Sequence, residues 1–81
     1  MVLYPTMNDG NFTLTFDTKL NEYTAIKVYD MNGREIKNVY EGNLANGNHL
    51  YKVSATDLES SMYMLVVSTV NGYSVSYFQV K

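Results

Sequence analysis

Apolar residues along this chain recur at every second position, and no window repeats with the spacing of a helix. Phe12, Leu14 and Phe16 alternate with polar residues, and Ile26 and Val28 repeat the pattern. Successive side chains of a β-strand point to opposite faces, so this alternation is typical of strands with one buried face. Eight Tyr and a single Pro also suit a pleated sheet. The pattern predicts an all-β protein.

Two of the Asn-Gly pairs of the chain predict tight hairpin turns. Asn32-Gly33 and Asn71-Gly72 each separate two strand-like runs. A type I′ turn matches the twist of a hairpin and needs positive φ at both central residues, which Asn tolerates and Gly adopts freely. We therefore expect two hairpins, at residues 25–40 and 62–80.

The strand and turn signals together predict the architecture. Residues 41–48 are rich in Gly and Asn and are expected to form a crossover loop, which a strand at 49–53 follows. About seven short strands with turns roughly every ten residues predict two packed antiparallel sheets, a small immunoglobulin-like β-sandwich. A small open barrel is the alternative. The chain shows no linker or low-complexity tract, so residues 1–81 are expected to form one domain.

Composition and charge narrow the function classes. The net charge is −2 and the basic residues are scattered, so nucleic acid is not an expected partner. No apolar run approaches the roughly 20 residues of a spanning helix, and we expect no membrane insertion. Met1 directly precedes a strand-like segment, and no charged region followed by an apolar one marks a signal peptide. We interpret the chain as a fragment excised from a larger precursor.

The residues that carry catalysis and metal binding are sparse. His49 is the only histidine and there is no cysteine, so a zinc site or a catalytic triad has too few members. We expect His49 to be solvent-exposed on a strand, and Ser60 and Ser61 to be turn formers. Carboxylates lie in separate turns without the ligand spacing of a calcium loop. We predict no cofactor, no metal and no enzymatic activity. The carboxylates considered are Asp9, Asp30, Asp57 and Glu59.

Tyrosine offers one further candidate site. Tyr rings could stack on sugars, since they combine an aromatic face with a polar tip. Alternation places Tyr73 and Tyr77 on one face of the last strand with Val75 between them. We favour packing in the core or across strands, with Val66, Tyr73, Val75, Tyr77 and Val80 closing the sandwich.

Three ordered segments carry a family resemblance. They are Tyr4 to Leu14, Ile26 to Arg34 and Asp57 to Tyr63, and the closing strand follows them. In this order they resemble the type IX secretion (Por secretion) C-terminal sorting domain, type A, of Bacteroidetes. That family typically opens with Tyr-Pro-Asn-Pro before an Asp-Gly-Asn turn, then carries Tyr-Asp-x-x-Gly and Asp-Leu-x-x-Gly-x-Tyr.

This chain departs from the family pattern at three positions. Thr6 and Met7 stand where the family usually has Asn and Pro, and Ser61 stands where it usually has Gly. If that Gly takes positive φ, Ser61 costs about 1 kcal/mol or bends the turn differently. The resemblance still covers nearly the whole chain, and the fold should tolerate these changes.

The resemblance implies a sorting signal rather than a reaction. Such a domain is the last part of a cargo protein, is recognised by the type IX outer-membrane translocon, and is usually removed by a surface sortase. The implied destination is the outer-membrane surface or the exterior, by way of the periplasm. Residues carried over from the family pattern, together with the closing segment, are Pro5, Gly10, Asp30, Gly33, Asp57, Leu58, Tyr63, Phe78, Gln79, Val80 and Lys81.

Two other hypotheses stay open from the sequence. The chain could be an immunoglobulin-like accessory or carbohydrate-binding module of a secreted enzyme or adhesin, similar to the sorting domain in architecture alone. A free edge strand could also bind partners by strand addition, so a homodimer through an edge is a further prediction. We expect most motif residues to act through folding, and the surface near Lys81 to make direct contacts.

Overall fold

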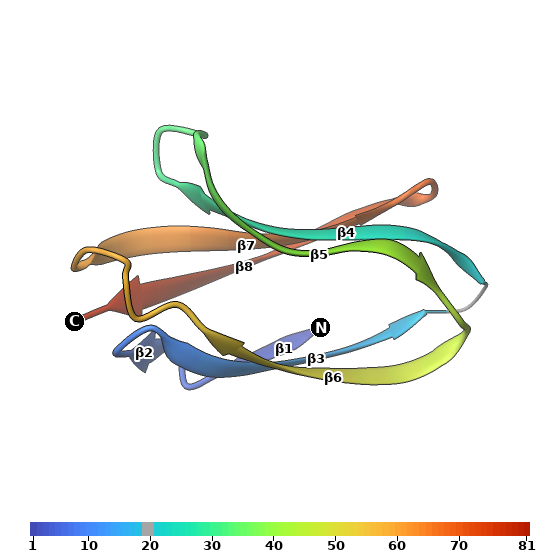
Figure 1. Cartoon of the computed structure of the whole chain (residues 1–81), viewed down its shortest axis with the longest axis horizontal. Helices are drawn as coiled ribbons and strands as arrows, with labels where there is room; N and C mark the ends of the chain where they lie inside the picture. The colour runs from blue at the N-terminus through green and yellow to red at the C-terminus, as the bar shows by residue number, and fades with distance from the viewer. Residues whose placement is uncertain (19–20) are drawn as a thin grey trace.

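The structure is a computed structural model that describes residues 1–18 and 21–81, in which eight strands form two sheets (Figure 1). No helix occurs among these residues, so none could cross a membrane. The strands are β1 (Val2–Tyr4), β2 (Met7–Asn8), β3 (Asn11–Thr18), β4 (Glu22–Asp30), β5 (Glu35–Leu44), β6 (Gly47–Ser54), β7 (Ser61–Thr69) and β8 (Gly72–Val80).

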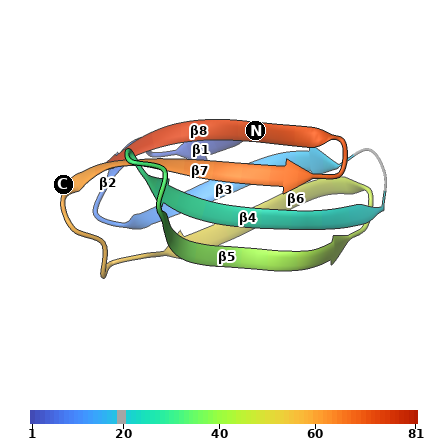
Figure 2. The same ribbon diagram turned by 90° about the horizontal axis from the view of Figure 1, so that it is seen from above.

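The two sheets lie face to face as a sandwich (Figures 1 and 2). One has three strands in the order β1-β3-β6, and the other has five in the order β2-β8-β7-β4-β5. Every pairing is antiparallel except that of β2 with β8, which is parallel. The prediction of an all-β sandwich is confirmed. The count is eight rather than about seven because β2 is a strand of only two residues, too short to leave a periodic pattern.

The core lies between the sheets and follows the predicted alternation. Phe12, Leu14 and Phe16 are all buried on β3, as are Ile26 and Val28 on β4. Aromatic rings fill the end of the core nearest the C-terminus, where the Phe78 ring lies 4.6 Å from that of Phe12 and 5.7 Å from that of Tyr63 between centroids. The other buried apolar residues are Leu3, Leu44, Val53, Ala55, Leu65, Val67 and Val80.

Of the β8 residues predicted to close the sandwich, Val80 is buried as predicted, but the prediction was wrong for the other three. Tyr73, Val75 and Tyr77 are 75%, 38% and 53% exposed, so they cover the outer face of the five-stranded sheet. Phe78 and Val80 are buried and fix the opposite set of positions as the inner face. The more apolar half of this strand therefore faces solvent.

Both predicted hairpins are present, but neither contains a type I′ turn. Asn32 and Asn71 do not take positive φ, since only glycines do so among the described residues. In the first hairpin the amide of Gly33 donates to the Asp30 carbonyl (3.0 Å) and Gly33 itself has φ of 86°. This is a type I turn followed by a glycine bulge, the common geometry for three-residue hairpin loops.

The predicted crossover at residues 41–48 does pass from one sheet to the other, but it is not a loop of that length. Strand β5 continues to Leu44 and β6 begins at Gly47, which leaves only Ala45 and Asn46 between them. His49 lies here on β6 and is half-buried, not exposed as predicted. Its Nε2 is 2.8 Å from the Ala45 carbonyl oxygen.

Candidate recognition site at the C-terminal end of the sandwich

The segments that carry the family motif are far apart in sequence and meet at one end of the sandwich. Asp30 pairs with Tyr63, Tyr63 pairs with Phe78, and Ser61 pairs with Val80. The β4–β5 turn, the loop before β7, strand β2 and the C-terminus all lie at this end in Figure 1. We call it the C-terminal end.

Strand β2 holds the end of β8 in place. The amide of Gln79 donates to the Thr6 carbonyl (2.7 Å), and the amide of Lys81 donates to the Asn8 carbonyl (2.9 Å). Asn8 is buried, and its side chain satisfies two backbone groups of its own turn. Its Nδ2 donates to the Pro5 carbonyl (2.9 Å), and its Oδ1 accepts from the Gly10 amide (2.8 Å). The segment around Pro5 therefore positions the last residues of the chain.

Gly10 joins this turn to the loop that precedes β7. Its carbonyl accepts a hydrogen bond from the Ala55 amide (2.8 Å), and its φ is 103°. A Cβ at this position would overlap the carbonyl oxygen of Ala55. Only glycine allows the two backbones to approach this closely, since it lacks that atom and adopts positive φ freely. The Ala55 carbonyl in turn accepts from the amide of Leu58 (3.1 Å).

The Asp30 carboxylate organises the β4–β5 turn. Its Oδ1 accepts hydrogen bonds from the amides of Asn32 and Arg34, both at 2.9 Å, and its Oδ2 lies 3.2 Å from Nε of Arg34. The Arg34 amide, followed by the Asn32 amide and the Arg34 charge, lowers the pKa of this carboxyl from its ordinary value of 3.8. Asp30 therefore has a structural role in holding the turn.

Tyr63 and Leu58 link the loop to the core. Tyr63 is buried and its hydroxyl donates to the Glu59 carbonyl (2.7 Å), while burial raises its pKa above 10.0. Leu58 is half-buried against the core and Asp57 is exposed. Ser61 does not take positive φ, so the cost considered for serine at this position does not arise.

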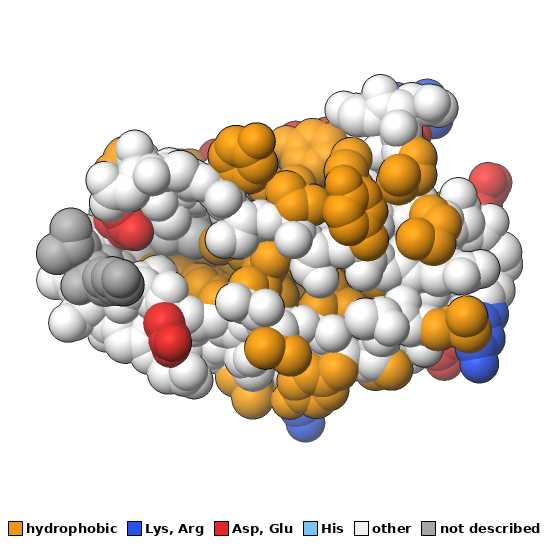
Figure 3. Space-filling view, turned by 180° about the vertical axis from the view of Figure 1, so that it is seen from behind, with side chains coloured by type: hydrophobic (Ala, Val, Ile, Leu, Met, Phe, Trp, Pro, Cys, Tyr) orange, Lys and Arg blue, Asp and Glu red, His pale blue; other side chains and the backbone are white. Residues whose placement is uncertain are grey.

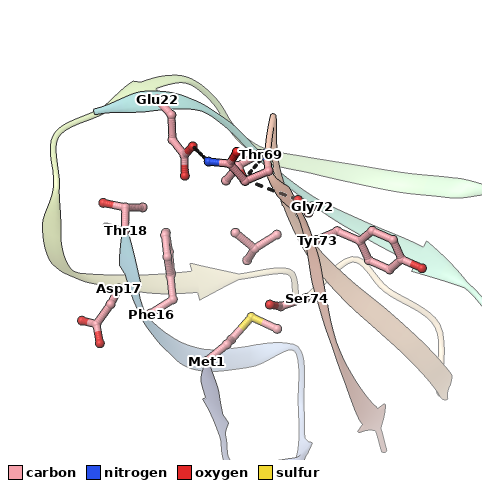
Figure 4. Close-up of a pocket in the computed structure, with 11 residues that line it drawn as sticks. Met1, Phe16, Asp17, Thr18, Glu22, Thr69, Gly72, Tyr73 and Ser74 are labelled. Atoms are coloured by element: carbon pink, nitrogen blue, oxygen red, sulfur yellow. Dashed lines mark hydrogen bonds between the residues drawn. The ribbon is translucent and has the colours of Figure 1, made fainter. Parts of the chain in front are cut away.

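A cavity of about 430 Å³ lies at this end. A second cavity of about 460 Å³ lies at the opposite end, between Phe16 and Thr18 of β3 and the β7–β8 turn (Figure 4). The two cavities differ in their relation to the predicted motif residues, because four of these residues line the first cavity and none lines the second. The motif residues at the first cavity are Asp30, Asp57, Leu58 and Tyr63.

The described residues at the two ends of the sandwich form no metal-binding cluster. No group of three or more His, Cys, Asp or Glu side chains comes together in the part of the chain that the structure describes. The C-terminal end instead presents turns, backbone groups and the exposed side chains of Gln79 and Lys81.

The prediction from sequence missed Asn8 and Thr6. Asn8 stands two residues before a glycine, which is the spacing at which an Asn side chain bonds a backbone amide in an Asx turn. That signal was available. Thr6 acts through its carbonyl, so its side chain gave no indication of the bond to Gln79.

A comparison with protein-family models assigns the chain to a family. The model of the secretion system C-terminal sorting domain matches residues 2–81. The chain belongs to this family. A search of curated proteins found no match.

The family assignment confirms the resemblance seen in the motifs. The sorting domain is a signal of type IX secretion, and this family is not catalytic. A sorting domain is part of a cargo protein. Its presence implies that the cargo interacts with the secretion machinery and is delivered to the cell surface or the exterior.

Proposed function

We propose that this sorting domain directs its cargo through the type IX outer-membrane translocon from the periplasm, and that a surface sortase then removes the domain. Residues 1–81 act in this proposal as one unit. Support comes from the convergence of the motif segments on the end that carries Lys81. A sorting signal of this kind needs a rigid domain that presents defined groups, and the backbone hydrogen bonds between β8 and the segment of β2 provide that rigidity.

The closing segment divides into two sets by burial. Phe78 and Val80 point into the core, whereas Gln79 and Lys81 are exposed. We assign direct contact with the translocon to Gln79 and Lys81, and a folding role to Phe78 and Val80. The remaining motif residues act by shaping the turns around them, through the hydrogen bonds of Asp30 and the close approach at Gly10.

The test is a reporter exported to the periplasm of a type IX-competent host and fused to this chain at its C-terminus. We expect the reporter at the cell surface with the intact domain, and in the periplasm when residues 77–81 are removed. Reporter that stays in the periplasm with the intact domain would contradict the sorting function.

A second set of variants separates contact from folding. The double change Gln79→Ala and Lys81→Ala is expected to leave the thermal midpoint within a few degrees and to reduce surface reporter about tenfold or more, since both side chains are exposed. Lys52→Ala is the matched control, because Lys52 is an exposed lysine on the other sheet. Equal surface delivery by the double variant and the control would contradict the assignment of contact residues.

A further inference from the structure

The edge of the three-stranded sheet is only partly covered by strand β1. The three residues of β1 pair with residues 13–15 of β3, whereas β6 pairs with β3 along its whole length, from Asn11 to Thr18. Of the described strands, only β1 and β6 pair with β3. Phe16, Asp17 and Thr18 therefore have a described strand on one side only. On the other side, the backbone of β3 is open to a further strand segment.

The direction of β1 carries the chain that precedes Met1 along this open edge. Strand β1 is antiparallel to β3 and pairs in order with residues 13–15. Continued toward the N-terminus, the same register places Met1 opposite Phe16. The first residue before Met1 then stands opposite Asp17, and the second stands opposite Thr18. We call the two residues that precede Met1 the extension.

The open end of β3 borders the cavity that lies opposite to the C-terminal end of the sandwich. This cavity of about 460 Å³ lies between Phe16 and Thr18 of β3 and residues 72–74 of β8. Figure 4 shows the side chains of Met1 and Phe16 at its wall, with Tyr73 directed away from it. Figure 3 shows the side of the molecule where β1 contacts β8, and apolar side chains are visible there in a hollow between the two sheets. The sandwich is therefore incompletely closed on this side.

Alternation along β1 decides which residue of the extension faces the cavity. Leu3 is buried and Val2 is 56% exposed, so Leu3 lies on the inner face of its strand. Met1 shares the face of Leu3 and lines the cavity. The second residue before Met1 shares that face too, and its partner in the register, Thr18, is buried. An apolar side chain at this second position would enter the cavity, while the side chain of the first residue would face solvent.

We propose that the occupant of this open edge is the cargo chain itself, whose last two residues extend β1 along β3 as far as Thr18 and close the cavity. A C-terminal sorting domain follows its cargo, so a cargo chain enters the domain at Met1. The inference deepens the proposed function and rests on it only for the presence of that chain. The extension gains backbone hydrogen bonds from the open edge and burial of an apolar side chain from the cavity. Because the extension is joined to β1, it is held beside this edge at a high effective concentration.

The extension places the cargo and the recognition site at opposite ends of the sandwich. Pairing toward Thr18 leads the cargo chain to the end where the β7–β8 turn lies. Gln79 and Lys81 lie at the C-terminal end, where they are bonded to the segment of β2. A cargo attached in this way leaves the proposed translocon contacts uncovered.

The first test compares three purified chains that differ only in the extension, each preceded by the same Gly-Ser-Gly-Ser leader. The extension is Val-Thr in the first chain, which directs Val into the cavity, and Thr-Val in the matched control, which directs Val to solvent. The third chain carries Gly-Gly. We expect Val-Thr to raise the thermal midpoint by about 5 °C or more over Thr-Val, because only the first order buries Val. A midpoint for Val-Thr no higher than that for Thr-Val or Gly-Gly would overturn the proposal.

The second test reads the register by disulfide formation, since the chain has no cysteine. A cysteine as the first residue before Met1 should bond to Asp17→Cys within one chain on oxidation. Opposed residues of an antiparallel pair lie about 4.5–5.5 Å apart between Cα atoms, within reach of a disulfide. The positive control is Val2→Cys with Thr15→Cys, a pair that the structure contains. The negative control pairs Asp17→Cys with a cysteine three residues further from Met1, about 10 Å along the extended chain.

The disulfide yields separate the proposed occupant from others. A yield no higher than that of the negative control would overturn the proposal. Disulfide-linked dimers in place of the bond within one chain would also overturn it, by assigning the edge to a second copy. Both tests use the purified domain without secretion, so their failure leaves the sorting function standing, and a failure of reporter delivery leaves this inference standing. Circular dichroism of each variant checks that the sandwich still folds.

Discussion

Removal of the Asn8 side chain should weaken the C-terminal end more than any exposed change near it. In Asn8→Ala, the Gly10 amide and the Pro5 carbonyl lose their partners in a buried turn. An unsatisfied buried backbone group such as the Gly10 amide costs about 1–3 kcal/mol. Loss of the partner of the half-buried Pro5 carbonyl costs about 1 kcal/mol. We expect the free energy of unfolding to fall by about 2–4 kcal/mol, or the thermal midpoint by about 10–30 °C.

The assay is urea denaturation together with hydrogen exchange. In Asn8→Ala the amides of Gln79 and Lys81 should exchange faster than in the unmodified domain, because their acceptors belong to the loosened segment. Asn11→Ala is the matched control, since the Asn11 side chain is exposed in the same turn and, among the described residues, hydrogen-bonds only to Asp9. Its effect should stay within about 0.5 kcal/mol.

Asn8→Asp adds a pH dependence with a definite sign. A carboxylate can still accept from the Gly10 amide, but it repels the Pro5 carbonyl, so the folded protein should raise the pKa of this carboxyl above about 3.9. The deficit relative to the unmodified domain should therefore be smallest below about pH 4, where the neutral acid donates to Pro5, and grow toward pH 7. Equal stability of Asn8→Ala and Asn11→Ala would refute the reasoning.

Three further predictions concern single positions. Gly10→Ala should destabilise by about 3 kcal/mol or more in urea denaturation, whereas Gly33→Ala, with open space around it, should cost about 1; similar values would contradict the close approach. The pKa of Asp30 is lowered in the folded domain, so its carboxylate contributes stability that is lost as pH falls below 3.8 toward that pKa. Asp30→Asn should remove this contribution. Acid-denaturation curves of the variant and the unmodified domain that run parallel would contradict this role of Asp30. Phe78→Ala should cost about 3–5 kcal/mol and Tyr77→Ala, on the exposed face, less than about 1 by thermal melting; a reversed order would mean that β8 has the opposite face inward.

Local patterns predicted most of the sandwich. The alternation on β3 and β4 identified buried residues such as Leu14 and Ile26, because strand periodicity and burial coincide there. The same reasoning failed on β8, where the more apolar set faces outward. Periodicity reveals that a strand has two faces, but tertiary packing decides which one is buried. On β8 the buried face is the one that carries Phe78 and Val80, and Tyr73 and Tyr77 lie on the exposed face.

The long-range backbone contacts could not be predicted from the sequence. Strand β2 has two residues and pairs in parallel with the far end of the chain, so no local pattern indicates it. The motif residues were found through family resemblance, and their meeting at one end depends on sheet order. Asn8 is the exception, because its spacing from Gly10 does carry a local signal for an Asx turn.

The pairing of β2 with β8 has a consequence for the order of folding. Residues 7 and 79 are almost a full chain length apart, so this strand pairing closes a very long loop and should form among the last. The segment around Asn8 stays without its partner strand until residues 79–81 have reached their place in the fold. A chain truncated by a few residues cannot complete the sandwich. Completion of the fold therefore requires the backbone of residues 79–81 to be in place.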